Sequence, residues 1–193
     1  GNVIDPLGVA ELYGTDAVRM ALVVGTAPGN DPIISEEKIR GYRNFANKLW
    51  NIHRFIMMAA AGGLKDKGRK MKARYSADDR KRLRELRTLV KKVTADMEQF
   101  RFHQAAETIY HYAWHTFADK IIEAAKPRLK TGTLQEKNAA RLLLLEIHSA
   151  ILKLLHPFMP FITEELWRNL QETKVIKATE GTKSLLMVQK WPT

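Results

Sequence analysis

The residues best equipped for chemistry lie between Arg40 and Phe55, in the segment RGYRNFANKLWNIHRF. A helix, which turns about 100° per residue, would gather carboxamides and cations here on the face opposite its apolar side chains. A carboxamide can match a base edge, an aromatic ring or guanidinium can stack on an unpaired base, and a cation can hold a phosphate. This face therefore suits unstacked RNA, unless its asparagines cap neighbouring helix ends and its arginines are merely solvated. Its members are Arg40, Arg43, Asn44, Asn47, Asn51 and Arg54, with Trp50 and Phe55 at the edges and Lys48 close to Phe55.

A second set of cations, Arg80, Arg84, Arg87 and Lys91, also has helical spacing. Cations on successive turns release counterions when they meet phosphates, so this stripe is our candidate for contact with an RNA backbone. A solvated helix face is the alternative, but four crowded like charges favour RNA. The stretch 65–92 holds thirteen lysines and arginines against four acids, which is +9 of the formal net charge of +11. Such a balance indicates an anionic partner, most often nucleic acid.

A third set, His103, Glu107, His111 and His115, is spaced by four and resembles metal ligands on a helix. One straight helix usually supplies at most two ligands to an ion, so we interpret these as surface or interface residues and predict no metal site. Trp114 beside them is interpreted as a packing or partner-contact residue.

Other chemistry has no sequence signal. The chain lacks cysteine, and therefore disulfides and thiolate metal sites, as suits a reducing cytoplasm. It has no nucleophile elbow, Walker loop, metalloprotease motif or dinucleotide loop, so we predict no catalytic residue. No apolar run approaches a membrane span, and no signal peptide is evident at the first residues. Because it begins at Gly1 without methionine, we expect a piece of a longer protein.

Helices must position these residues, and the periodicity predicts a mainly α fold. We expect an antiparallel bundle of four or five helices over residues 35–193 and a small N-terminal module over residues 1–34. The sequence predicts a loop at residues 64–75 and a short strand at residues 184–191. The Ser35 helix should bury Ile39, Tyr42, Ala46, Leu49, Ile52 and Ile56. The predicted helices are one reaching Tyr13, one from Asp16 to Val24, one from Ser35 to about Ala61, one after Ser76, one from Phe102 to a stop at Pro127, one from Leu134 to Leu155 and one beginning at Pro160.

Five segments, in this order, resemble class I valyl-tRNA synthetases: GNVIDP (1–6), YGTDAVRMAL (13–22), APGND (27–31), SEEKIRGYRNFANKLWN (35–51) and HPFMPFITEELW (156–167). The segments GNVIDP and HPFMPFITEELW are similar to isoleucyl and leucyl members too. In contrast, APGND followed by SEEKIRGYRNFANKLWN is similar to the valyl branch. The resemblance implies the anticodon-binding domain of a class I aminoacyl-tRNA synthetase. Residues 1–34 would then be a stem-contact-like module that touches the inside of the tRNA and links the bundle to the catalytic domain.

The resemblance also implies partners and site residues. Family members read anticodon bases from the helix carrying NKLWNIHRF, so the resemblance assigns this role to Lys48, Asn51, Arg54 and Phe55. Phe55 would stack on a base, and Asn51 would read a base edge. Arg43, Asn44 and Asn47 match as well, although packing would also explain them. The expected partners are valine tRNA isoacceptors and the catalytic and editing domains of a cytoplasmic parent valine–tRNA ligase. That parent would use ATP and Mg²⁺, and we expect no cofactor in the present chain.

This chain departs from the resemblance at Lys120 and Ile121, where family members usually have tryptophan and tyrosine after the equivalent of Asp119. Contacts from that helix are therefore left open. Three other interpretations also stay open: the domain of an isoleucyl- or leucyl-type synthetase, a basic bundle that binds RNA or DNA without reading it, and a structural bundle whose histidine stripe binds metal.

Overall fold

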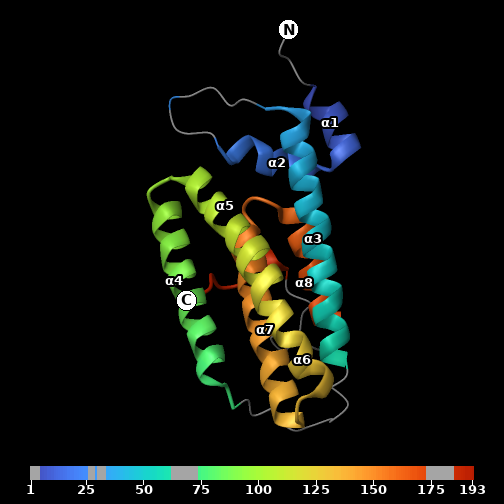
Figure 1. Ribbon diagram of the computed structural model, residues 1–193. Helices are drawn as coiled ribbons and strands as arrows, with labels where there is room; N and C mark the ends of the chain where they lie inside the picture. The colour runs from blue at the N-terminus through green and yellow to red at the C-terminus, as the bar shows by residue number, and fades with distance from the viewer. Residues whose placement is uncertain (1–4, 26–28, 30–33, 62–73, 173–184) are drawn as a thin grey trace.

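The computed structural model describes residues 5–25, 29, 34–61, 74–172 and 185–193, and within these ranges the chain is helical with no strand (Figure 1). Of the predicted loop at 64–75, residues 64–73 lie outside the described residues, and residues 74–75 are not helical. The helices are α1 (Pro6–Tyr13), α2 (Thr15–Val23), α3 (Glu36–Ala61), α4 (Ala77–Glu98), α5 (Phe102–His111), the π-helix η1 (Tyr112–Ile122), α6 (Glu123–Thr131), α7 (Leu134–Leu155), α8 (Pro160–Glu172) and the 3₁₀ helix η2 (Leu186–Val188).

The long helices run along one bundle axis, and α1 and α2 lie at one end of it (Figure 1). Helix α7 is central, because most of its side chains are buried and it packs against α3, α4, α5 and α6. Helices α5, η1 and α6 follow one another without a break from Phe102 to Thr131. The predicted mainly α bundle is therefore confirmed, as is the central position of residues 134–155.

Local capping residues explain where the predicted helices begin. Ser76 and Asp79 form a reciprocal capping box, in which each side chain accepts a hydrogen bond from the other residue's backbone N–H, at 3.0 and 2.9 Å. Thr133 and Glu136 form the same motif at the start of α7. At α3 the Ser35 hydroxyl accepts a hydrogen bond from the backbone N–H of Lys38. These interactions satisfy N–H groups that have no partner within the helix.

The expected stop at Pro127 is wrong, because Pro127 lies inside α6 and the helix continues to Thr131. A proline removes one N–H and crowds the carbonyl one turn earlier, which bends a helix without necessarily ending it. The π-helical segment η1 ends at Ile122, and Pro127 lies beyond it, inside the α-helical α6. The helix ends instead at Gly132, whose N–H donates to the Arg128 carbonyl.

The expected strand at 184–191 is also wrong over its described part, where residues Leu186–Val188 form a 3₁₀ turn. A single strand has no stability without a pairing edge, and the described residues offer none. The segment is held by other contacts. The buried Leu186 donates its N–H to the Glu164 carboxylate at 2.9 and 3.0 Å, and the Trp191 indole donates to the Thr94 hydroxyl at 2.8 Å.

Helix α2 is tied to the start of α8 and the residues just before it by the side chains of Asp16 and Arg19. The Asp16 carboxylate accepts the backbone N–H groups of Phe161 and Ile162 at 3.3 and 2.7 Å, and so caps α8. The Arg19 guanidinium donates to the carbonyls of Pro157 and Phe158. A small apolar cluster on α1 and α2 reaches Ile39, while Met20 and Val24 join the main core. The division of the chain at residue 34 stays a prediction.

Candidate nucleic-acid interface

The outward face of α3 gathers the residues expected to contact RNA. Arg40, Arg43, Arg54 and the three asparagines Asn44, Asn47 and Asn51 are all exposed. None of the three asparagine side chains forms a hydrogen bond to another described residue, so capping of a neighbouring helix is not observed in that part of the chain. Trp50 lies at the edge of this face with 42% of its surface exposed. Donors and acceptors on this face are therefore available to a ligand.

Lys48 and Phe55 differ from the exposed residues of that face because other side chains of the protein already contact them. The Lys48 ammonium lies 3.1 Å from the Asp119 carboxylate and 5.2 Å from the centre of the Trp114 ring. Phe55 is half-buried against the core, and the Lys126 ammonium lies 6.0 Å from its ring centre. A fixed ring loses little conformational freedom when it stacks on a base. An RNA phosphate, however, would have to compete with Asp119 for Lys48.

An aromatic cluster, Phe45, Tyr110 and Trp114, lies beneath this face and joins α3 to α5 and η1. The Phe45 ring is 4.8 Å from Tyr110 in an edge-on contact and 6.0 Å from Trp114 in a stacked one. Trp114 is thus a packing residue, one of its two expected roles. The expected apolar stripe omitted Phe45, although Phe45 is fully buried and the chosen Ala46 and Tyr42 are only partly so. The spacing 45, 49, 52, 56 was the available signal.

The histidine stripe forms surface pairs. His111 Nε2 lies 3.7 Å from Glu107, His115 Nδ1 lies 3.6 Å from Asp119, and the two imidazoles stack with centres 5.6 Å apart. Among the residues that the structure describes, no three histidine, aspartate or glutamate side chains are placed to hold one metal ion.

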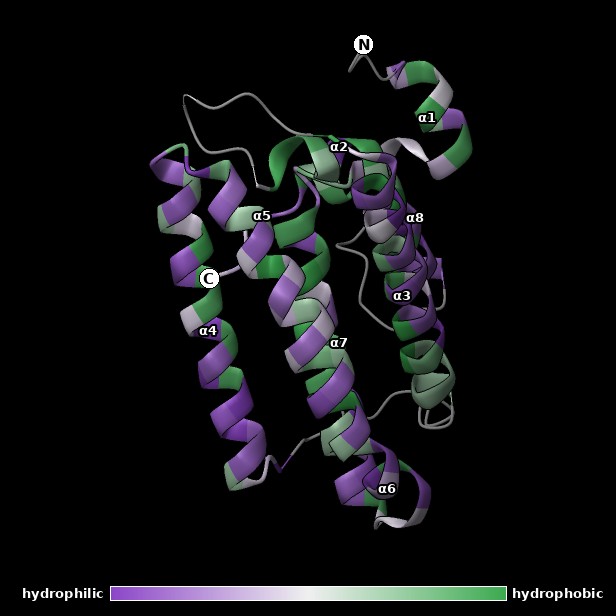
Figure 2. Ribbon diagram, turned by 45° about the horizontal axis from the view of Figure 1, so that its top comes forward, coloured by the Kyte–Doolittle hydropathy of each residue, from purple (hydrophilic) through white to green (hydrophobic). Residues whose placement is uncertain are grey.

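The basic stripe of α4 lies apart from the α3 face. Arg80, Arg84, Arg87 and Lys91 are all exposed, and hydrophilic residues predominate on α4 in Figure 2. Arg80 donates to the Tyr75 carbonyl at 2.6 Å. Helices α3 and α4 lie on opposite sides of the bundle, with η1 and α7 between them (Figure 1). The structure therefore places the two predicted sets on separate surfaces and does not bring them together.

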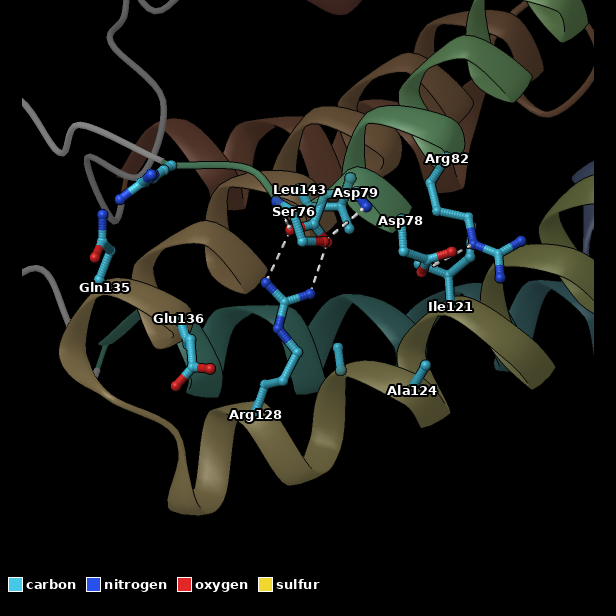
Figure 3. Close-up of a pocket in the computed structure, with 12 residues that line it drawn as sticks. Ser76, Asp78, Asp79, Arg82, Ile121, Ala124, Arg128, Gln135, Glu136 and Leu143 are labelled. Atoms are coloured by element: carbon cyan, nitrogen blue, oxygen red, sulfur yellow. Dashed lines mark hydrogen bonds and ion pairs between the residues drawn. The ribbon is translucent and has the colours of Figure 1, made fainter.

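A surface pocket of about 370 Å³ at the start of α4 contains an ion pair that the sequence did not reveal (Figure 3). The Arg128 guanidinium binds both oxygens of the buried Asp79 carboxylate, at 2.6 and 2.9 Å. Burial alone would raise the pKa of Asp79, but the hydrogen bonds from Arg128 and Ser76 hold that pKa below its ordinary value. This pair fastens α4 to α6, and we assign it a structural role.

The inward face of α3 carries a second polar contact that the sequence did not reveal. His53 Nδ1 lies 3.1 Å from His148 Nε2, and His53 Nε2 lies 3.0 Å from the Asn169 side-chain oxygen. If His53 Nε2–H donates to that oxygen, His148 Nε2–H must donate to His53, which leaves His148 Nδ1 as a bare acceptor. That buried atom has no hydrogen-bond partner among the described residues. Burial, followed by the nearby His53, lowers the pKa of His148 to about 3.

Comparison with solved structures defines the class of fold. The chain is similar to a methionyl-tRNA synthetase of Mycobacterium tuberculosis (TM-score 0.73, 22% identity, 86% of this chain and 34% of that one). It is also similar to the LeuRS of Agrobacterium radiobacter, solved as a ternary complex with tRNA and LeuAMS (TM-score 0.65, 26% identity, 100% of this chain and 21% of that one). The fold is that of the anticodon-binding region of class I tRNA synthetases. No helix in the described part of the chain is long and apolar enough to cross a membrane.

Residues 79–193 match the family described as the anticodon-binding domain of tRNA ligase, and the chain belongs to that family. Curated relatives include the valine–tRNA ligase of Geobacter sulfurreducens, 44% identical over 88% of this chain, and that of Clostridium tetani, 38% identical over all of it. The resemblance to valyl-tRNA synthetases is thereby confirmed. The chain spans about a fifth of the length of these relatives, 19% and 21% respectively.

Proposed function

We propose that this chain positions valine tRNA by its anticodon, so that a catalytic domain of the same parent chain can charge the distant acceptor end. The parent would be a cytoplasmic valine–tRNA ligase that uses ATP and Mg²⁺. The observation that carries the proposal is the outward face of α3, where exposed asparagines and arginines have no partner in the described chain. The 44% identity to a valine–tRNA ligase supports the choice of tRNA.

Each residue of the α3 face has a role that follows from its chemistry. Asn51 offers a donor and an acceptor side by side and would read a base edge, and the half-buried Phe55 ring would stack on an unpaired base. Arg54 would hold a phosphate or stack on a base, and Lys48 would hold a phosphate. Arg43, Asn44 and Asn47 would extend the contact one to two turns towards the start of the helix.

The module at residues 1–34 would transmit the position of the bundle to the rest of the parent. The Asp16 and Arg19 contacts to the start of α8 support this role, because they hold α2 against the bundle. A bound anticodon would then fix the orientation of the N-terminal end of the chain, where we expect the catalytic and editing domains to join.

The test is a titration of the chain with valine tRNA and with the same tRNA carrying an exchanged anticodon, repeated over a series of salt concentrations. We expect the exchanged anticodon to weaken binding at every salt concentration, because base contacts are independent of counterion release. Equal affinity for the two tRNAs across the series would refute anticodon reading. Isoleucine and leucine tRNAs in the same titration test the related synthetases as alternatives.

The basic α4 stripe favours a second candidate, a bundle that binds RNA without reading it. Four exposed cations on one helix face would supply affinity through phosphates alone. Under this candidate all tRNAs of similar length bind alike, and affinity falls steeply with salt.

A further inference from the structure

A pocket of about 520 Å³ opens between α4 and η1, in a region that neither the α3 face nor the Asp79–Arg128 pair occupies. Helices α4 and α5 are joined by a short turn and diverge from it along the bundle (Figure 1). The residues that face α4 across the pocket therefore come from η1. Both walls present residues about one turn apart. The lining residues are Lys81, Arg82, Arg84, Glu85 and Thr88 from α4 and Tyr112, Thr116 and Lys120 from η1.

The pocket carries an excess of positive charge. Among the described residues that line it, the single carboxylate is Glu85, which is already paired with Arg82 at 3.2 Å. The cations Lys81, Arg84 and Lys120 have no carboxylate within 4.0 Å among the described residues. Three uncompensated like charges around one pocket repel one another, and a bound anion would relieve that repulsion.

Tyr112 supplies an independent sign of a missing acceptor. Only 9% of its surface is exposed, and its hydroxyl has no hydrogen-bond partner in the described part of the chain. Burial raises the pKa of this hydroxyl, which therefore stays protonated and remains a donor. A buried donor without an acceptor costs free energy, and such groups in a folded protein call for an explanation.

We propose that this pocket seats a phosphate group of the bound RNA backbone. Lys81 and Arg84 approach it from one wall and Lys120 from the other, with the hydroxyls of Tyr112 and Thr116 as additional donors. The proposal rests on the proposed function for its ligand, RNA, but not on anticodon reading. It also gives a role in RNA binding to Lys81 and Lys120, two cations outside the predicted stripe. Arg84 belongs both to that stripe and to the pocket.

The first test measures tRNA affinity of the 193-residue chain over a salt series for Lys120→Ala and Lys81→Ala. Each substitution should weaken valine tRNA and its anticodon-exchanged form by the same several-fold factor and reduce the salt slope by about 1, as loss of one phosphate contact does. The control is Lys130→Ala, an exposed cation outside the pocket, which should change neither quantity. Unchanged affinity and slope for Lys120→Ala would overturn the proposal.

A second variant, Tyr112→Phe, separates ligand binding from folding. It removes an unpaired buried hydroxyl, so resistance to urea should be unchanged or increased while tRNA affinity falls. Unchanged affinity in a folded Tyr112→Phe chain counts against the hydroxyl as a donor and overturns that part of the site.

A final arm distinguishes an RNA phosphate from a free one. Inorganic phosphate is titrated while the amide resonances of Thr116 and Lys120 are followed by NMR. Shifts there, together with unchanged tRNA affinity of the variants, would identify a site for small phosphates and overturn the RNA assignment.

If the chain binds no tRNA, this proposal and the proposed function both fail. If it binds tRNAs without discrimination and Lys120→Ala weakens all of them, only anticodon reading fails.

Discussion

The two faces of helix α3 differ in what covers them. Its inward face is fully packed, with Phe45, Leu49 and Ile56 at 0 to 1% exposure, whereas its outward face carries Asn47, Asn51 and Arg54 in contact with solvent. Both faces belong to one continuous helix of 26 residues. The core side chains and the side chains proposed to contact RNA are therefore attached to the same helical backbone.

This difference separates stability from binding. Buried apolar side chains contribute through area removed from water and through close packing, so their loss acts on folding. Exposed polar side chains without partners contribute little to folding and are free to contribute to binding. Substitutions on α3 should thus divide cleanly into two classes, and the experiments that follow test that division.

The largest effect is expected for Phe45→Ala on the inward face. Removing this ring leaves a cavity between α3, Tyr110 and Trp114, and should lower the free energy of unfolding by about 3–5 kcal/mol. Urea denaturation followed by far-ultraviolet circular dichroism measures it. The matched control is Asn44→Ala, the exposed neighbour on the outward face, which should stay within about 0.5 kcal/mol of the original chain.

The buried histidines should make the fold sensitive to mild acid. Burial lowers the pKa of both His53 and His148 below the ordinary 6.5, so the neutral forms are required in the folded state. Stability is then complete above pH 6.5 and is lost as the pH falls from 6.5 towards the folded pKa, which for His148 is about 3. At pH 5.5 the loss should reach about 1.4 kcal/mol for His148, and the lowered pKa of His53 adds to it in the same direction. Urea denaturation at pH 7.5 and 5.5 measures this loss.

His148→Leu serves as the control for that measurement, since it removes one of the two titrating groups. The variant should lose less stability between pH 7.5 and 5.5 than the original chain, whatever its stability at pH 7.5. His156, whose pKa burial also lowers, titrates in both chains and cancels in the comparison. An equally steep loss in the variant would show that His148 is not the group responsible.

The outward face of α3 was predictable because one helix defines it. Period and capping residues alone place Asn47 and Asn51 on the same side, and Ser35 and Ser76 mark where α3 and α4 begin. The same holds for α7, whose apolar run 134–155 matches its observed bounds.

Contacts between helices could not be read from the sequence. Asp79 and Arg128 are 49 positions apart, and His53 and His148 are 95 apart, so only the packed bundle brings each pair together. Lys81 and Lys120 share a pocket for the same reason. Pro127 misled the prediction because a proline can bend a helix without ending it, and α6 continues to Thr131.

On the outward face, Phe55→Ala tests whether recognition can be lost without folding. Stacking of one base on an aromatic ring contributes about 1 to 3 kcal/mol, so valine tRNA should bind that much more weakly. The anticodon-exchanged tRNA should lose less. Fluorescence anisotropy with labelled tRNA measures both affinities, and urea denaturation corrects for any loss of the half-buried ring from the core. Equal losses for the two tRNAs would assign Phe55 to packing alone.

The smallest effect per tRNA is expected for Arg84→Ala, which extends the comparison from α3 to α4. Because a guanidinium on a phosphate carries no sequence information, every tRNA should weaken by a similar factor, and the salt slope should fall by about 1. Asn51→Ala is the matching substitution on α3, and it should alter the ratio of the two affinities while leaving the slope unchanged. If Arg84→Ala changed the ratio, α4 would take part in reading bases, and the separation of the two surfaces would have no functional meaning.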